Sequence, residues 1–224
     1  MKTTLIIPTM NEIDGVKAIM PKIDRSWCDE VIIVDGGSKD GTVEWLQENK
    51  WNVFVQSQRG LGHAYREALS KTSGDVILTF SPDGNSLAEK IPELIAKMKE
   101  GYDMVIVSRY FGSSKSQDDD ALTSIGNPIF TGTINFLFGG SYTDSLVIFR
   151  AYKRSILDRL NIDAVHMTYE AQISMRAAKA KLKIADIGGD EPKRIGGERK
   201  MNPFKVGSAI IWEMLRSLLW RQTI

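Results

Sequence analysis

Two polar clusters near the amino terminus carry side chains that could bind a nucleotide. In the first, Pro8 ends an apolar run, and Asn11 and Glu12 follow with groups that can hydrogen-bond a base or a ribose. In the second, Asp35 closes another apolar run, and the two glycines after it let the backbone approach a ligand closely. A simpler explanation exists for each cluster, because a strand that runs into a helix cap contains the same residue types. The second cluster is not a Walker loop, since it lacks the pattern GxxxxGK[ST].

Every polar cluster in the first half of the chain directly follows an apolar, β-branched run. The sequence predicts strands at Thr3–Ile7, Glu30–Asp35, Asn52–Gln56, Asp75–Phe80 and Asp103–Ser108, and helices at Glu12–Pro21, Gly41–Lys50, Leu61–Thr72 and Leu87–Glu100. Apolar strands separated by crossover helices indicate an α/β fold with a mostly parallel central sheet covered on both faces. Ligands bind beyond the carboxyl ends of such strands. We therefore expect the loops with Asp35, Asp83 and Arg109 to converge on one pocket.

The second half of the chain alternates helices, strands and polar loops. Phe111–Asp120 is rich in Gly and Ser, which predicts a mobile loop, and its three aspartates indicate a solvated surface. The predicted elements that follow are a helix at Thr123–Phe138, a strand at Asp144–Phe149, helices at Lys153–Leu160 and Thr168–Lys181, a strand at Leu182–Asp186, a polar loop at Glu191–Asn202 and a last helix from Pro203.

The composition narrows the class of protein. The chain has 224 residues, of which 42% are apolar and 25% charged, as in ordinary soluble domains. A net charge of +1 leaves no basic surplus for nucleic acid. Its one cysteine, Cys28, cannot form an internal disulfide, which fits a reducing compartment. No run reaches the roughly 20 apolar residues that cross a bilayer, so we expect a cytoplasmic protein with at most peripheral contact with the inner face of a membrane.

An ordered set of short motifs resembles one enzyme family. The motifs are IPTMNE (7–12), VDGGSKDGT (34–42), RGLGHA (59–64), SRY (108–110), TDS with FR (143–150) and RIGGERKM (194–201). In order and spacing they are similar to those of the family 2 glycosyltransferases, and the last resembles the R-x-x-G-x-S-K-M loop of polyprenyl-phosphate sugar synthases such as dolichol-phosphate mannose synthase. Each motif alone is weak, whereas the ordered set is specific. The resemblance implies the GT-A (nucleotide-diphospho-sugar transferase) fold and a nucleoside-diphosphate sugar as donor.

The chain departs from this family where a metal would bind. The family has D-x-D after its fourth strand, and these carboxylates hold Mg²⁺ or Mn²⁺ against the diphosphate; here the segment is Ser81-Pro82-Asp83-Gly84-Asn85. Hard divalent ions need oxygen ligands, some of which the diphosphate can supply. The resemblance therefore implies Mg²⁺ or Mn²⁺ on Asp83 with help from Asn85, bound more weakly because Ser81 replaces an aspartate. In isolation the same segment would be an ordinary turn.

Glycosyl transfer leaves negative charge on the departing diphosphate, so cations near the leaving oxygens favour the reaction. Besides the metal ion, the candidates are Arg194, Arg199 and Lys200, and the planar fork of an arginine can bind two phosphate oxygens at once. A solvated basic loop would have the same composition.

The acceptor decides whether a base is needed. A hydroxyl acceptor needs one, whereas a phosphate monoester is largely dianionic near neutral pH, with a second pKa of about 6. Related enzymes that use hydroxyls place acidic groups in the helical segment that contains Glu170, and Asp144 is the other candidate. Each carboxylate could equally be structural.

The last segment, 203–224, is apolar and places Trp212 and Trp220 beside basic residues. It could be an amphipathic helix on a membrane surface, or a helix packed on the domain or on a partner subunit in a homodimer. We therefore divide the chain into a catalytic domain at residues 1–202 and a C-terminal helix at residues 203–224.

Together these observations predict an inverting glycosyltransferase that moves a sugar from a UDP- or GDP-sugar to a polyprenyl (dolichyl-type) phosphate, without contact with nucleic acid. The alternatives are transfer to a saccharide hydroxyl in cell-surface polysaccharide synthesis and a sugar-nucleotide-binding protein that has lost catalysis. The predicted catalytic residues are Asp83, Asp144, Glu170 and Arg199, and the predicted metal ligands are Asp83 and Asn85. The predicted donor-binding residues are Pro8, Thr9, Asn11, Glu12, Asp35, Gly37, Ser38, Gly60, Ser81, Arg109, Arg194 and Lys200.

Overall fold

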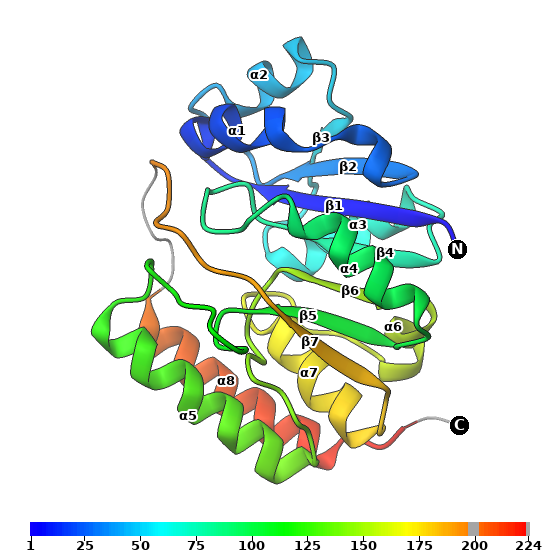
Figure 1. Cartoon of the computed structure of the whole chain (residues 1–224), viewed down its shortest axis with the longest axis vertical. Coiled ribbons are helices and arrows are strands. Elements are labelled where there is room, and N and C mark those ends of the chain that lie inside the picture. The colour runs from blue at the N-terminus through cyan, green and yellow to red at the C-terminus, as the bar shows by residue number, and fades with distance from the viewer. Residues whose placement is uncertain (197–201, 223–224) are drawn as a thin grey trace.

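The strands that build the central sheet are short apolar runs. The computed structural model describes residues 1–196 and 202–222, and in this part of the chain seven strands form one sheet in the order β3-β2-β1-β4-β6-β5-β7 (Figure 1). The strands are β1 (Thr3–Thr9), β2 (Glu30–Asp35), β3 (Val53–Val55), β4 (Val76–Thr79), β5 (Met104–Ser108), β6 (Arg150–Lys153) and β7 (Ile184–Gly188). Neighbouring strands are parallel except for β6, which is antiparallel to both β4 and β5. The predicted mostly parallel sheet is confirmed.

Helices cover both faces of the sheet, which explains why its strands are apolar on both sides. The helices are α1 (Ile13–Ile19), α2 (Thr42–Glu48), α3 (Leu61–Ser70), α4 (Lys90–Lys99), α5 (Ala121–Phe138), α6 (Ser155–Leu160), α7 (Tyr169–Lys179) and α8 (Pro203–Leu219). On one face Leu5 and Leu78 pack with residues of α1, α2 and α4. On the other face Ile6 and Ile77 pack with residues of α3, α6 and α7.

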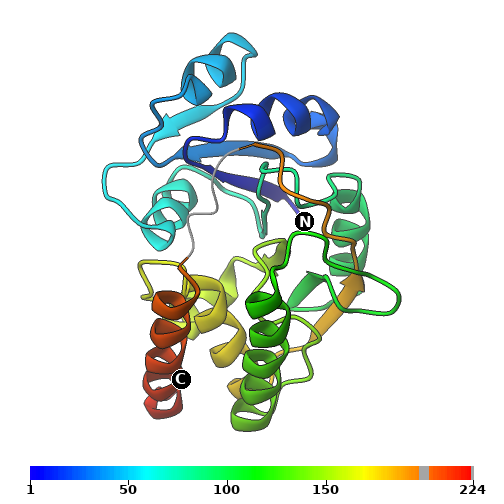
Figure 2. The ribbon, with the colours of Figure 1, turned by 90° about the vertical axis from the view of Figure 1, so that its left-hand side faces the viewer.

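Helices α5 and α8 form an outer layer against α7 (Figures 1 and 2). Ile210 and Met214 of α8 are buried in the core, and the buried Glu213 accepts a hydrogen bond from Nε2 of Gln172 at 2.7 Å. The C-terminal segment therefore packs on the rest of the chain. Among the described residues, no helix combines the length and the apolar character that a membrane span requires.

The predicted strand at Asp144–Phe149 is wrong, because this segment is irregular and the strand begins at Arg150. Side chains take the backbone carbonyls that a neighbouring strand would otherwise bind. The Arg150 guanidinium donates to the carbonyl oxygen of Val147 at 2.9 Å and to that of Ser145 at 3.2 Å. Thr79 donates its hydroxyl to the carbonyl oxygen of Ile148 at 2.6 Å. Side chains thus satisfy the carbonyl groups of Ser145, Val147 and Ile148, whereas that of Phe149 accepts a backbone hydrogen bond from Val107 of β5 at 3.0 Å.

Candidate active site

A pocket of about 370 Å³ opens at the carboxyl ends of β1 and β4, the side of the molecule that faces the viewer in Figure 2. In the sheet, β2 and β3 lie on one side of β1 and β4 lies on the other, so the order of the strands reverses at β1. Ligands bind at such switch points of open α/β sheets. We call this cavity the strand-end pocket. The predicted residues that line it are Pro8, Thr9, Glu12, Gly60, Ser81, Asp83, Asn85 and Arg194.

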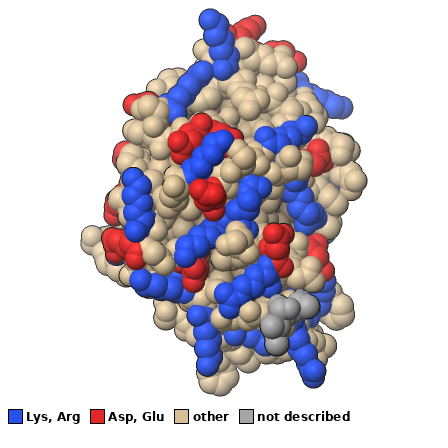
Figure 3. Space-filling view, turned by 90° about the vertical axis from the view of Figure 1, so that its right-hand side faces the viewer, with Lys and Arg blue, Asp and Glu red and all other residues tan. Residues whose placement is uncertain are grey.

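The opposite end of the sheet differs in character. There, acidic side chains lie among the basic ones over the upper and middle parts of the visible face, and basic side chains predominate at its lower end (Figure 3). A continuous basic stripe of the kind that binds nucleic acid is not seen on this face.

Asp35 points into its own loop instead of into the strand-end pocket. Its side chain is fully buried, and its carboxylate accepts hydrogen bonds from the N–H groups of Gly37 and Ser38 at 2.8 and 2.7 Å and from the hydroxyl of Thr9 at 2.8 Å. Asn11 supports the same loop, because its side-chain oxygen accepts a hydrogen bond from the loop backbone at 2.8 Å. The loop after β2 therefore reaches the strand-end pocket, as predicted. Asp35 itself does not face the pocket, because its carboxylate binds groups within that loop.

The carboxylate of Asp83 is engaged by an arginine. Its Oδ2 lies 2.6 Å from Nη2 of Arg194, and Nη1 of the same guanidinium lies 3.3 Å from Oε1 of Glu12. These three residues come from the loops after β4, β7 and β1, so they join parts of the chain that are far apart in sequence.

The described residues do not form a ready site for Mg²⁺ or Mn²⁺. Ser81 offers only a hydroxyl, and the side-chain amide of Asn85 donates to Glu191 at 3.4 Å. The described ranges contain no group of three or more His, Cys, Asp or Glu side chains arranged to hold a metal. Because the carboxylate of Asp83 already binds a guanidinium, an ion would have to displace Arg194. The assignment of Asp83 and Asn85 as metal ligands stays a prediction.

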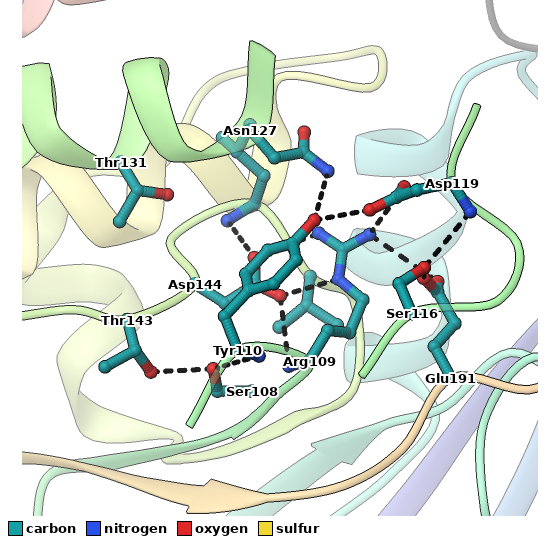
Figure 4. A network of polar contacts seen from close by, with 12 residues as sticks. Ser108, Arg109, Tyr110, Ser116, Asp119, Asn127, Thr131, Thr143, Asp144 and Glu191 are labelled. Carbon is teal, nitrogen blue, oxygen red and sulfur yellow. Dashed lines mark hydrogen bonds and ion pairs between the residues drawn. The ribbon is translucent and has the colours of Figure 1, made fainter. Parts of the chain in front are cut away.

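Arg109, at the end of β5, is surrounded by carboxylates (Figure 4). Its Nε and Nη2 bind the two oxygens of Asp144 at 2.6 and 3.0 Å, and its Nη1 lies 3.5 Å from Glu191 and 3.7 Å from Asp119. Burial alone would lower the pKa of Arg109, but its interactions with Asp144 and Glu191, together with Tyr110, outweigh burial and the pKa is raised. Asp144 is fully buried in this pair, which favours a structural role for it over that of a base.

Asp118 and Asp119 of the aspartate run belong to the site, so the prediction of a solvated surface is wrong for these two, whereas Asp120 is exposed as predicted. Asp118 lines the strand-end pocket and accepts a hydrogen bond from the backbone N–H of Arg194 at 3.1 Å. The side chain of Asp119 is 4% exposed and lies beside Arg109. Asp120 caps α5 by accepting a hydrogen bond from the N–H of Thr123 at 2.7 Å. Asp118 binds a partner that is 76 positions away in sequence, which charge patterning along the chain does not reveal.

Glu170 lies beneath the site. Its side chain is 2% exposed, and its Oε2 lies 3.1 Å from Nε of the fully buried Arg150. Burial raises the pKa of Glu170 to about 7, although Arg150 acts in the opposite direction. Glu170 lines a small cavity of about 140 Å³ together with Asp83, Asn85 and Arg109, which places it next to the strand-end pocket.

Sequence reasoning missed Glu191 and Met167, which line both the strand-end pocket and the small cavity. Burial raises the pKa of Glu191, opposed by Arg109, and the hydroxyl of Ser116 donates a hydrogen bond to it. A signal existed for Glu191, since it follows a predicted strand and precedes Arg194 by three residues. Met167 carried no such signal. Arg199 and Lys200 lie outside the described residues, so their assignments stay predictions.

An apolar groove adjoins the strand-end pocket. It has a volume of about 460 Å³ and lies between α5 and α8. Phe130 of α5 and Ile210 of α8 line it, and it shares Met167 with the strand-end pocket and Arg109 with the small cavity. We call it the α5–α8 groove.

Residues 4–160 match the family described as glycosyl transferase family 2. The chain belongs to this family. It is therefore a glycosyltransferase. Among curated relatives, glycosyltransferase AglJ of Haloferax volcanii is 27% identical over 95% of this chain and 70% of that protein. The dolichyl-phosphate hexose transferase of the same organism is 29% identical over 92% of this chain and 89% of its own length. The undecaprenyl-phosphate mannosyltransferase of Micrococcus luteus is 27% identical over 98% and 99% of the two chains.

Solved structures confirm the GT-A fold. Glucosyl-3-phosphoglycerate synthase from Mycobacterium tuberculosis, in complex with Mg²⁺ and UDP, superposes with a TM-score of 0.73 over 99% of this chain and 81% of that chain, at 19% identity. The same enzyme with Mn²⁺, UDP-glucose and phosphoglyceric acid has a TM-score of 0.72 over the same shares of the two chains, also at 19% identity.

Proposed function

We propose that this family 2 glycosyltransferase moves a sugar from a nucleoside-diphosphate sugar, a UDP- or GDP-sugar, to a polyprenyl phosphate with inversion at the anomeric carbon. The observation that carries the proposal is the meeting of two unlike cavities at Met167, the polar strand-end pocket and the apolar α5–α8 groove. A nucleotide and a lipid tail need adjoining sites of these two kinds. Relatives that are named as transferases to dolichyl and undecaprenyl phosphate support it.

In this proposal the donor lies over the ends of β1 and β4, with its diphosphate toward Asp83 and Arg194. The acceptor lipid lies in the α5–α8 groove with its phosphate at the Met167 end. An oxygen of that phosphate attacks the anomeric carbon while the bond from this carbon to the diphosphate oxygen breaks, and the nucleoside diphosphate leaves with the negative charge. Arginine near the leaving oxygens stabilises this charge more in the transition state than in the ground state. We assign the same role to Arg199 and Lys200.

The placement of the two predicted bases, Asp144 and Glu170, favours a phosphate acceptor over a hydroxyl acceptor. A hydroxyl needs a base within hydrogen-bond reach, but Asp144 is fully buried against Arg109 and Glu170 is 2% exposed. A polyprenyl phosphate brings its own nucleophilic oxygen, because its monoester is largely dianionic near neutral pH.

The proposed acceptor lies in a membrane, and the outer layer of the molecule suits such a surface. On α5 the exposed apolar residues include Ile125, Ile129 and Phe136, and on α8 they include Trp212 and Leu219. We propose that this face rests on the membrane as a peripheral contact and brings the α5–α8 groove to the lipid.

The proposal is tested first by ligand binding and then by transfer. The unfolding midpoint of the purified protein is measured with UDP, GDP, CDP and dTDP at millimolar concentration, with Mn²⁺ and with EDTA. We expect one diphosphate to raise the midpoint, since a ligand at about 100 times its dissociation constant stabilises by about 2.7 kcal/mol. The matching labelled sugar nucleotide is then incubated with vesicles that contain a polyprenyl phosphate, and we expect label in the lipid fraction.

Two results would count against the proposal. If none of the four nucleotides shifts the midpoint in either buffer, the strand-end pocket is not a donor site. If one binds but label reaches no lipid phosphate, the choice of acceptor fails, and Ser81→Asp then tests for a degenerate binder. A gain of turnover in that variant from near zero would identify one.

A further inference from the structure

The segment at residues 194–196 is fixed over the strand-end pocket by its own backbone. The N–H of Ile195 donates to the carbonyl oxygen of Asp83 at 2.7 Å, and the N–H of Arg194 donates to Asp118 at 3.1 Å. Ile195 packs closely on Gly84. A Cβ atom added to Gly84 would lie 2.5 Å from the side chain of Ile195. The guanidinium of Arg194 is thus carried on an anchored stretch of backbone.

The guanidinium of Arg194 occupies the place where a cation would meet both the protein and a diphosphate. It lies 2.6 Å from Asp83 and 3.3 Å from Glu12, and the other polar side chains at residues 81–86 of the loop after β4, Ser81, Asn85 and Ser86, are neutral. Its Nε is buried and has no hydrogen-bond partner within the part of the chain that the structure describes. Asp83 and Glu12 therefore do not use all the N–H groups of this guanidinium, and Arg194 lines the strand-end pocket.

A fixed arginine and a divalent ion would compete for the same oxygen of Asp83. A metal ion in this position binds the carboxylate on one side and the phosphate oxygens on the other. Arg194 already binds the carboxylate, carries the positive charge, and has a planar fork that fits phosphate oxygens. With a serine at position 81, the pocket offers an incoming ion one carboxylate fewer than a D-x-D sequence would.

We propose that Arg194 takes the place of the divalent cation, so that its guanidinium binds the donor diphosphate and donor binding does not require a metal ion. This inference rests on the proposed function. It deepens that function by naming the cation of the donor site, which is the guanidinium of Arg194. The solved relatives with Mn²⁺ or Mg²⁺ bound beside UDP would differ from this protein in that respect.

The test measures the affinity of the nucleoside diphosphate that the panel selects, by titration calorimetry, in EDTA and in millimolar Mn²⁺. For the natural protein we expect the two dissociation constants to agree within about threefold, a difference below 1 kcal/mol. Arg194→Gln should weaken binding in EDTA by about tenfold or more, because charge-assisted hydrogen bonds to phosphate are lost. Arg194→Lys should retain part of the affinity, since it keeps the charge without the fork.

Two further variants sharpen the test. Lys193→Gln removes the same charge one residue away from an exposed position, and it should leave the affinity in EDTA unchanged. Ser81→Asp supplies a second carboxylate and should make binding stronger in Mn²⁺ than in EDTA.

The outcomes separate this inference from the proposed function. Binding by the natural protein in Mn²⁺ but not in EDTA overturns the role of Arg194 and leaves the donor site standing. Unchanged affinity of a folded Arg194→Gln variant in EDTA overturns it as well. No binding of any nucleotide in either buffer refutes the donor site itself.

Discussion

At Arg109 a single guanidinium joins four parts of the chain. It extends from the end of β5 to Asp144 before β6, to Asp119 before α5 and to Glu191 after β7. All of these carboxylates are at most 9% exposed, so water screens their interactions with Arg109 poorly. Such a cluster holds loops in place only while its charges remain matched.

Asp144→Asn should therefore destabilise the protein. Loss of one partner of a buried pair leaves an uncompensated charge, which costs about 3 kcal/mol or more. The free energy of unfolding in urea measures the change. Glu100→Gln is the matched control, because its pair with Lys97 is largely exposed and should contribute little to stability. A variant Asp144→Asn as stable as the control would show that Asp119 and Glu191 suffice for Arg109.

Glu170 makes stability depend on pH in the direction opposite to an ordinary surface carboxylate. Burial raises its pKa from 4.5 to about 7, so between these values the folded state binds more protons than the unfolded state. The contribution of Glu170 to stability must then fall as the pH rises from about 4.5 to about 7. We expect Glu170→Gln to remove this pH-dependent loss of stability. The loss is on the order of 3 kcal/mol between pH 4.5 and pH 7.

The measurement is the free energy of unfolding of both proteins at several pH values between 5 and 8. The difference between natural protein and Glu170→Gln should shift in favour of the variant as the pH rises. A difference that stays constant over this range would mean that the pKa of Glu170 is not raised in the folded state.

At the scale of elements, α5 and α8 present an apolar outer face that the rest of the described chain leaves uncovered. Phe136 is 87% exposed, Leu219 84% and Trp212 65%. Contiguous apolar surface on paired helices indicates contact with a membrane or with another protein. Because the α5–α8 groove opens beside this face, we favour the membrane.

The double variant Trp212→Glu, Leu219→Glu should lose binding to vesicles of anionic lipids in a flotation assay. Both side chains are exposed, so their replacement leaves the core intact, and the added charges oppose partition into the interface. Val55→Glu is the control, since Val55 is 53% exposed on β3 at the far edge of the sheet. Equal flotation of the double variant and the control would point to a protein partner for this face.

At the scale of the whole molecule, the amino-terminal half of the fold could be predicted from sequence. Its five strands were placed within one or two residues of their observed bounds, because a buried parallel strand is a local apolar run. The position of β6 could not be predicted. It inserts between β4 and β5 through long-range pairing, and the preceding segment looks apolar enough to be a strand although side chains satisfy its backbone.

The candidate site was predictable as a set of loops but not as a set of contacts. The position of each polar cluster at a strand end follows from the sequence, and these loops do line one pocket. Which side chains face the pocket depends on partners elsewhere in the chain. Asp35 turns inward to its own loop, and Arg194 reaches Glu12 across 182 positions. Local residue patterns carry no information on such pairs.

The insertion of β6 imposes an order on assembly while the chain is being made. Strands β1 to β4 pair only with one another until β6 arrives, so they can assemble as soon as they leave the ribosome. β5 has no neighbour in the sheet until Arg150–Lys153 emerges, a wait of several seconds at about 5–20 residues per second. During that time its polar backbone edges are unpaired and its apolar side chains are uncovered in the nascent chain. A holdase chaperone should therefore bind stalled chains that end between residues 110 and 150 more strongly than shorter or complete ones.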